Sequence, residues 1–247
     1  MSKQSQENQQ TDLVLGYWPF AGRNMPVIFM LEILNIPYQV NIFDQNTWFG
    51  KEKEDLNLDF PNLPFLIDNS NGMKITEIHN IVNYILYKYE KGRNLQDIHR
   101  SSPYTQSRNR VKLSADHSSY NPIDDFKIDE IRFILNDVFT QISSATAKFP
   151  QENQIKYAQD TIVPKLNKLI KFIEQKNQAT TSYTQYFVMG YLSVVDCYFY
   201  IISKYFQKYF PSLYDDYSHV FDLVLNSFEN IPEIKKYINS DKYPTLG

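Results

Sequence analysis

The spacing of hydrophobic positions changes character partway along the chain. In the first 92 residues the apolar runs are short and separated by turn residues, which is typical of strands alternating with helices. Pro26 falls in the first turn of one apolar run, where its missing N–H costs a helix nothing. The pattern predicts strands at 13–18, 38–43, 65–67 and 74–75, and helices at 25–34 and from 76 to about 88.

Beyond residue 104 the apolar positions follow the i, i+3, i+4, i+7 rhythm of amphipathic helices. Ser193 and Asp196 have the spacing of a capping box, in which an acidic side chain at the third helical position caps the helix start. This part is therefore predicted to be all helical. The clearest helical stretches are 128–142, 162–173, 193–206 and 218–228, followed by a final turn from Ile231-Pro232.

These patterns predict an α/β domain at 12–92 and an all-helical domain at 104–240. The segment from Gly92 to Ser107 is polar and contains Pro103, so it is predicted to be a linker. Residues 1–11 are polar and rich in Gln, without the apolar stretch of a signal peptide. We expect them to be a disordered tail.

Composition excludes several classes of function. With 25 basic and 28 acidic residues the net charge is −3, which offers no positive surface for nucleic acid or anionic membrane. The apolar segment 187–206 carries Asp196 and Lys204, which a membrane-spanning helix tolerates poorly, so a buried helix is predicted. The four histidines lack metal-ligand spacing, and no metal is expected. The single cysteine, Cys197, indicates a reducing compartment.

The segment Leu58–Asp68, LDFPNLPFLID, carries the most specific signal. Pro64 lies at the start of an apolar run, where a strand tolerates a residue without N–H. A cis Leu63–Pro64 bond would present the backbone of Leu63 to a peptide-like ligand, as an added strand would. An ordinary strand entered through a trans proline is the alternative that this segment alone leaves open.

The order of elements, with a proline before the third strand and a helical domain following, resembles the cytosolic glutathione transferases. LGYW at Leu15–Trp18, the Leu58–Asp68 segment and KIT at Lys74–Thr76 resemble the mu class. Gly190 and the Ser193–Asp196 box match the family's helical domain. The resemblance implies a thioredoxin-like domain of βαβ-ββα order, followed by the all-helical domain.

The resemblance also implies the chemistry. In this family the thiolate of glutathione attacks an electrophile, and a free thiol with a pKa of about 8.5 needs help to ionise at neutral pH. Tyr17 stands at the position whose hydroxyl stabilises the thiolate. Arg23 follows Gly22 as in the alpha and sigma classes, where an arginine lies near the sulfur and would lower the thiol pKa. A solvated arginine at a helix start is the alternative.

For glutathione itself, the resemblance implies contacts along one edge of the first domain. Leu63, presented by Pro64, is expected to hold the cysteinyl unit. Glu77 is expected near the ligand's ammonium, at a helix N-terminus that also attracts its carboxylate. The remaining implied contacts are Trp18 and, at the glycyl end, Trp48, Asn62 and Lys53, for which Lys51 is interchangeable.

Three positions match the family less closely. Ile78 replaces the serine of the family, and losing its hydrogen bond to a carboxylate costs about 1.5–3 kcal/mol, or roughly tenfold or more in affinity. Serine at this position is therefore predicted to tighten glutathione binding. Tyr120 superficially matches an acceptor-site tyrosine, and Asp116 is the nearest candidate for an acidic residue crossing a dimer interface.

The sequence thus predicts a cytoplasmic, homodimeric glutathione transferase that conjugates glutathione, its co-substrate, to small hydrophobic electrophiles. A binding or scaffold protein that keeps the fold but has lost efficient catalysis is the first alternative, favoured by Ile78 and Ala21. A sigma-like glutathione-dependent isomerase is the second, supported by Gly22-Arg23 alone.

Overall fold

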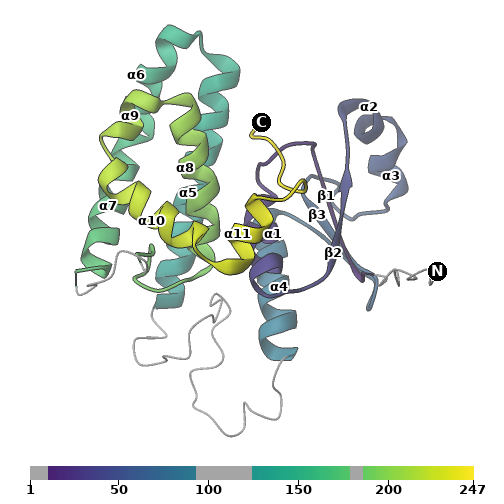
Figure 1. Cartoon of the computed structure of the whole chain (residues 1–247). Helices are drawn as coiled ribbons and strands as arrows, with labels where there is room; N and C mark the ends of the chain where they lie inside the picture. Colours follow the sequence, from purple (N-terminus) through teal and green to yellow (C-terminus); the bar gives the residue numbers. More distant parts are fainter. Residues whose placement is uncertain (1–10, 93–123, 179–185) are drawn as a thin grey trace, which may run out of the picture.

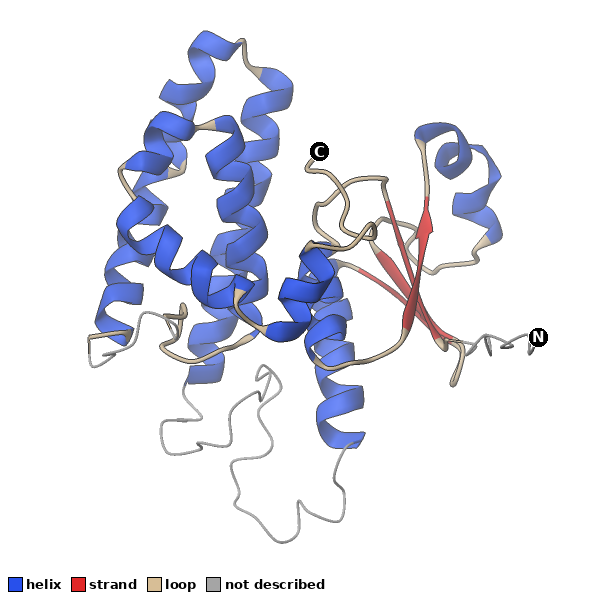
Figure 2. Cartoon of the chain, viewed as in Figure 1, coloured by secondary structure: helices blue, strands red, loops and turns tan. Residues whose placement is uncertain are grey.

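The computed structural model describes residues 11–92, 124–178 and 186–247. A four-stranded sheet of order β2-β1-β3-β4 forms one side of the molecule, and helices form the other (Figure 2). The predicted α/β and all-helical parts are both confirmed. The predicted tail, apart from Thr11, and the predicted linker beyond Gly92 lie outside the described residues.

The sheet combines one parallel and two antiparallel pairs. β1 runs parallel to β2, pairing Leu13 with Tyr38, whereas β3 runs antiparallel to both β1 and β4. Gly16 is needed in β1 because a Cβ there would lie 2.1 Å from the ring of Phe65. The elements of this part are β1 (Leu13–Tyr17), α1 (Met25–Ile33), β2 (Tyr38–Ile42), β3 (Phe65–Asp68), β4 (Met73–Thr76) and α4 (Ile78–Gly92).

The stretch between β2 and β3, for which the sequence predicts no regular element, contains three short helical segments. They are α2 (Gln45–Thr47), the π-helical η1 (Trp48–Glu52) and α3 (Lys53–Asp55). Asp44 caps the first of them, since its carboxylate accepts a hydrogen bond from the Thr47 N–H at 2.8 Å. Each segment is too short to show a helical period, which is why the apolar pattern does not reveal it.

The helical part begins with α5. The capping box predicted from Ser193 and Asp196 is formed, at the start of α8 (Val194–Tyr209). The Asp196 carboxylate accepts hydrogen bonds from the N–H of Ser193 at 2.8 Å and from the N–H of Val188 at 2.8 Å. Two helices, α6 and α9, were not predicted, because α6 buries only Ala158 and α9 is five residues long. The helices are α5 (Asp124–Lys148), α6 (Gln151–Thr161), α7 (Val163–Lys176), α8 (Val194–Tyr209), α9 (Pro211–Asp215), α10 (Ser218–Glu229) and α11 (Pro232–Ile238).

One continuous hydrophobic core joins the two parts. Helix α1 lies between the sheet and the helical part and contacts α4, α8 and α11 (Figure 1). Phe29 on α1 packs its ring edge-on against Tyr200 of α8 and Phe228 of α10, at 5.2 and 5.3 Å between centroids. The position of the β1–α1 loop is therefore tied to the helical part.

A second, smaller cluster gathers aromatic and aliphatic side chains around the ends of β1 and β3. Its buried members are Tyr17, Phe43, Trp48, Leu58, Leu63 and Phe65. Three of them, Tyr17, Trp48 and Leu63, are residues that the sequence analysis assigns to the glutathione site. These three predicted site residues therefore pack together in a hydrophobic cluster separate from the main core.

Candidate functional site

Tyr17 is the last residue of β1, and its side chain is 4% exposed. Its hydroxyl oxygen accepts a hydrogen bond from the Arg23 N–H at 3.0 Å. Gly22 makes this approach possible, because a Cβ there would lie 2.7 Å from the hydroxyl oxygen. Burial raises the pKa of Tyr17, so the phenol stays neutral. Its proton has no acceptor among the described residues and remains available to an anion.

The side chain of Arg23 is held by α5. Its guanidinium donates to the side-chain oxygens of Asn136 at 2.6 Å and Thr140 at 2.8 Å. It also lies over the ring of Phe139, 5.1 Å from the centroid. The positive charge lowers the pKa of Tyr17, but less than burial raises it. Arg23 therefore connects the β1–α1 loop to the helical part, in addition to placing a cation beside Tyr17.

The Leu63–Pro64 peptide bond is cis, as predicted. The Leu63 N–H donates to the side-chain oxygen of Asn62 at 2.9 Å. The Asn62 amide nitrogen in turn donates to Glu77 Oε1 at 2.9 Å. Three residues of the predicted glutathione set are thus linked by hydrogen bonds, with the exposed Asn62 and Glu77 at the surface.

Glu77 adopts a left-handed backbone conformation with φ of 67°, which costs a residue with a side chain on the order of 1 kcal/mol or more. Its carbonyl accepts the first hydrogen bonds of α4, from the N–H groups of Asn80 and Ile81 at 2.9 Å each. Glu77 therefore stands at the entry to α4 with its carboxylate exposed. A strained residue at a helix N-terminus, beside the cis proline loop, is typical of a ligand contact.

Ile78 does not point to the surface. It is 5% exposed and lines a narrow crevice between the two parts, together with Arg23, Pro26, Phe139 and Tyr198. Its side chain therefore packs between the sheet domain and α5 and α8. Only its backbone, in the first turn of α4, can serve the anion site proposed for that helix end.

The predicted glycyl contacts Trp48 and Lys53, and the further predicted glutathione contact Trp18, lie in different environments. Trp48 is 3% exposed, and its indole stacks on Phe65 with centroids 6.2 Å apart. Its described contacts are those of a core residue. Trp18 is half-buried and lies 6.4 Å from the ring of Phe49, while the Lys53 ammonium is 5.9 Å from that same ring. Trp18 and Lys53 thus both lie near the exposed ring of Phe49.

Residues 245–247 help to hold the β1–α1 loop, which carries Arg23. The sequence pattern does not indicate these contacts. The Ala21 N–H donates to the Thr245 carbonyl at 2.7 Å. Tyr205 of α8 donates its hydroxyl to the Ala21 carbonyl and accepts from the Gly247 N–H at 3.1 Å. The two contacts to Ala21 join residues 184 and 224 positions apart, and the Gly247–Tyr205 contact spans 42, so no local pattern indicates them. Tyr120 and Asp116 lie outside the described residues.

A second group that sequence reasoning missed surrounds His79, next to Ile78. The buried Arg132 donates to the side-chain oxygen of Asn83 at 3.0 Å and pairs with Asp129 at 3.2 Å. The His79 ring stacks on Tyr198 with centroids 5.7 Å apart. Burial, with a further contribution from Arg132, lowers the pKa of His79 to about 4. His79 is therefore neutral at pH 7 and packs as an aromatic ring.

The described ranges hold no group of three or more His, Cys, Asp or Glu side chains placed to bind a metal ion. Within the same ranges no helix has both the length and the apolar character to span a bilayer. The sole cysteine, Cys197, is fully buried, and burial raises the pKa of its thiol well above the ordinary range. It is neither accessible nor ionised.

A four-stranded mixed sheet with a cis proline before β3, joined to an all-helical part, defines a thioredoxin-like domain with a helical domain. Solved structures share this architecture: the Pi-class glutathione S-transferase of Onchocerca volvulus superposes with a TM-score of 0.69 at 16% identity. The match covers 96% of this chain and 98% of that one.

Sequence comparison leads to the same family. Residues 136–241 match the model of the glutathione S-transferase C-terminal domain. Glutathione S-transferase Mu 1 of Mus musculus is 26% identical, over 94% of this chain and 92% of its own length. The class-mu 26 kDa isozyme 51 of Fasciola hepatica is 24% identical, over 93% and 89%. Most of the helical part thus matches the glutathione S-transferase C-terminal domain, and mu-class glutathione S-transferases are relatives of nearly the whole chain.

Proposed function

We propose that this chain is a glutathione transferase in which Tyr17 stabilises the thiolate of glutathione. The observation that carries the proposal is the neutral Tyr17 hydroxyl, which accepts from the Arg23 N–H and keeps its own proton for a further acceptor. With a pKa of about 8.5, only about 3% of a free thiol is ionised at pH 7. A hydrogen bond and a nearby guanidinium favour the anion and raise that fraction.

Beyond stabilising the thiolate, the protein has only to hold glutathione and the electrophile close together in the proposed reaction. The thiol releases its proton to solvent, and the thiolate donates its electron pair to an electrophilic carbon of a small hydrophobic molecule. A carbon–sulfur bond forms, and a leaving group departs or the adduct takes up a proton. Leu63, Asn62 and Glu77 would hold the tripeptide, with the cysteinyl unit at Leu63 and the γ-glutamyl end at Glu77 and the start of α4.

Asn62 has a specific role in this proposal. In the structure its side-chain oxygen occupies the Leu63 N–H, the same donor that the cysteinyl unit would use. Binding of glutathione would therefore require the Asn62 side chain to rotate away from Leu63. Because Asn62 is exposed, water can solvate the displaced amide.

A non-catalytic glutathione-binding protein is the second candidate, and one observation favours it. Ile78 fills a position between the two parts with an apolar side chain, so the γ-glutamyl carboxylate would have only backbone donors there. The missing side-chain hydroxyl would weaken glutathione binding, but it would leave the thiolate-stabilising role of Tyr17 unaffected. The isomerase reading gains no support, since the guanidinium of Arg23 is engaged by Asn136 and Thr140.

Retention on immobilised glutathione, followed by conjugation rates measured against pH, tests the proposal. We expect the wild-type protein to be retained. Tyr17→Phe should lower the conjugation rate by at least about tenfold, and by up to the 10²–10³ typical of losing one anion-stabilising donor. Tyr157→Phe, which removes a hydroxyl from α6, is the matched control and should keep full activity. Retention without conjugation in the wild type would favour the second candidate, and an unchanged pH profile in Tyr17→Phe would exclude Tyr17 from the mechanism.

We also propose a homodimer in the cytoplasm. Phe60 supports the dimer, because its side chain is 81% exposed at the start of the loop that carries Asn62 and Leu63. A phenyl ring so exposed beside a functional loop is typical of an anchor at a protein interface. The single buried cysteine is in keeping with a reducing compartment.

A further inference from the structure

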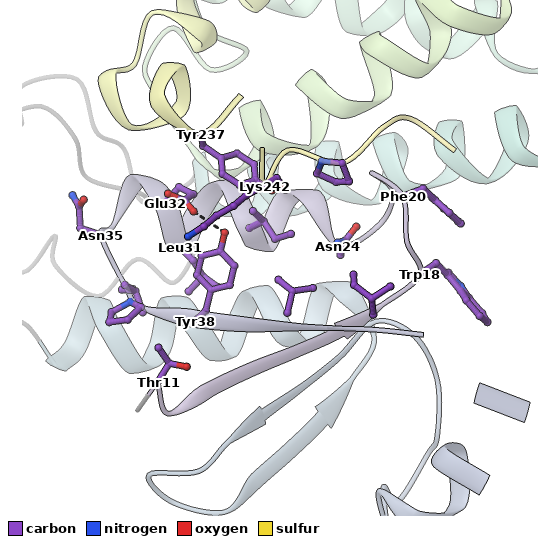
Figure 3. Close-up of a pocket in the computed structure, with 16 residues that line it drawn as sticks. Thr11, Trp18, Phe20, Asn24, Leu31, Glu32, Asn35, Tyr38, Tyr237 and Lys242 are labelled. Atoms are coloured by element: carbon purple, nitrogen blue, oxygen red, sulfur yellow. Dashed lines mark hydrogen bonds between the residues drawn. The ribbon is translucent and has the colours of Figure 1, made fainter. Parts of the chain in front are cut away.

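A groove of about 640 Å³ runs along α1, on the side that faces β2 and the segment following α11 (Figure 3). Its walls come from α1, from β2 and from residues 237–244. Among the residues assigned to glutathione, only Trp18 touches it. Its volume is within the range of small-molecule sites, which is about 300–1,000 Å³.

The middle of the groove is apolar. Ile28 and Leu31 line it from α1, and Val40 and Ile42 line it from β2. Tyr38, Val40 and Ile42 share one face of β2 because alternate side chains of a strand point the same way. Ile42 is 56% exposed and Val40 is half-buried, so these two side chains face solvent, whereas Leu31 and Ile28 are buried beneath them. An apolar molecule that covers Val40 and Ile42 gains about 25 cal/mol per Å² buried.

One end of the groove holds a fixed carboxylate. The hydroxyl of Tyr38 donates to Glu32 Oε1 at 2.6 Å, as Figure 3 shows. None of the described residues donates to the other oxygen, Oε2. Burial, and secondarily the hydrogen bond to Glu32, raise the pKa of Tyr38 far above its ordinary value. Tyr38 thus stays a neutral donor that holds Glu32 in place.

Lys242 approaches the same end but is held less firmly. Its side chain extends toward the groove in Figure 3, yet the residue is exposed. No ion pair involving it forms within 11–92, 124–178 and 186–247. An exposed ammonium is screened by water and can swing aside, whereas the half-buried and anchored carboxylate cannot. Glu32 therefore sets the charge that the groove selects.

The opposite end is aromatic. Trp18 and Phe20 line it near Asn24, at the start of α1. Eight residues separate Asn24 from Glu32, and a helix rises 1.5 Å per residue, so the two ends are about 12 Å apart. This matches a molecule with two aromatic rings in line.

We propose that this groove binds an elongated hydrophobic amine, with the protonated nitrogen at Glu32 and the aromatic body between α1 and β2, toward Trp18 and Phe20. The ammonium donates to Glu32 Oε2, and the rings cover Val40 and Ile42. This inference does not depend on the transferase activity, since Glu32 has no part in it.

Three probes with one body and different charges test the proposal by calorimetric titration at pH 7: biphenyl-4-methylamine, the neutral biphenyl-4-methanol and the anionic biphenyl-4-carboxylate. We expect the amine to bind at least tenfold more tightly than the alcohol and the acid most weakly. Glu32→Gln keeps an oxygen for the Tyr38 hydroxyl and should reduce amine affinity at least tenfold while leaving the alcohol unchanged. Glu152→Gln, an exposed carboxylate on α6, is the matched control.

Lys242→Ala is a second variant at an exposed position, so its folding is not at issue. It should strengthen amine binding by about two- to threefold. Saturating glutathione should change the amine affinity by less than about threefold. The proposal is overturned if the amine does not bind, if the acid binds more tightly than the amine, or if Glu32→Gln binds the amine like the wild type. It is also overturned if Lys242→Ala binds the amine more weakly or if glutathione abolishes binding.

Discussion

At the scale of single residues, the sequence and the structure lead to different predictions for a substitution at Ile78. In the sequence, Ile78 occupies a place where the family has a serine, and replacing it with serine is predicted to tighten glutathione binding. In the structure its side chain is 5% exposed and packs in the crevice beside Pro26 and Tyr198. The packing cost therefore has to be weighed against any hydrogen bond gained.

We now expect Ile78→Ser to lower the free energy of unfolding by about 2–4 kcal/mol, because it opens a cavity and buries a hydroxyl. Glutathione affinity should change less than threefold. Chemical unfolding and calorimetric titration of both proteins check this, with Ile78→Val as a control that should cost only about 0.5–1.5 kcal/mol. A clear gain in affinity would mean that the side chain faces the ligand.

His79 is expected to make stability depend on pH. Its pKa is about 4 in the folded protein, against 6.5 for the ordinary side chain, because burial and Arg132 disfavour the charged ring. As the pH falls from about 6.5 to 4, the unfolded chain takes up a proton that the folded protein does not. Unfolding is then favoured, and stability falls with pH across this window.

The measurement is the difference in melting temperature between the wild type and His79→Gln from pH 7 to pH 4. The wild type should lose its advantage as the pH is lowered. The difference is needed because burial raises the pKa of Asp196 to about 7, and this group acts in the opposite sense over the same range. A difference that stays constant with pH would show that His79 titrates normally in the folded protein.

At the scale of elements, the start of α8 depends on one buried carboxylate. Asp196 is fully buried and accepts from the N–H groups of Ser193 and Val188 and from the Ser193 hydroxyl. It thereby fixes both the first turn of α8 and the segment before it. The turn between them needs Gly190, whose φ is 76° and whose Cβ would lie 2.7 Å from the Lys176 carbonyl oxygen.

Asp196→Ala should lower the free energy of unfolding by about 3–5 kcal/mol, because it leaves buried donors unpaired. Ser193→Ala removes one of the three hydrogen bonds and should cost about 1 kcal/mol. Urea unfolding of the two variants gives the comparison. Equal, small effects in both would indicate that water replaces the carboxylate.

At the scale of the whole molecule, the site loop and the proposed dimer surface are adjacent. Phe60 is 81% exposed and precedes Asn62 and Leu63 by two and three residues. Burying a phenyl side chain is worth about 1.5–3 kcal/mol. If Phe60 anchors a second copy, removing it should weaken association and disturb the neighbouring glutathione contacts.

Phe60→Ser is accordingly expected to shift the protein from dimer to monomer at micromolar concentration, measured by sedimentation equilibrium. The dissociation constant should rise at least tenfold, which corresponds to about 1.4 kcal/mol. Ile155→Ser on α6 removes a side chain that is 43% exposed and should leave the mass unchanged. A wild type that is monomeric at these concentrations would contradict the proposal.

The sequence by itself determined the local elements and the most specific motif. Apolar periods located β1, α1 and the main helices, because a strand or helix is a repeating local geometry that side chains must match. The Ser193–Asp196 box and the Leu58–Asp68 segment carry their information within eleven residues or fewer. The resemblance to the glutathione transferases came from such short segments, and it implied the cis Leu63–Pro64 bond and a Tyr17 at the end of β1, as the structure has them.

Only the tertiary structure decided what surrounds those residues. Arg23 pairs with Asn136, 113 positions away, and the Thr245 carbonyl holds Ala21 beside the site. Ile78 is an interdomain packing residue, and Trp48 lies in a buried aromatic cluster rather than at a polar surface. The groove over β2 exists because α1, β2 and residues 237–244 meet there. A periodic pattern records which face of an element is buried but not which distant element covers it, and that choice depends on the packing of the whole chain.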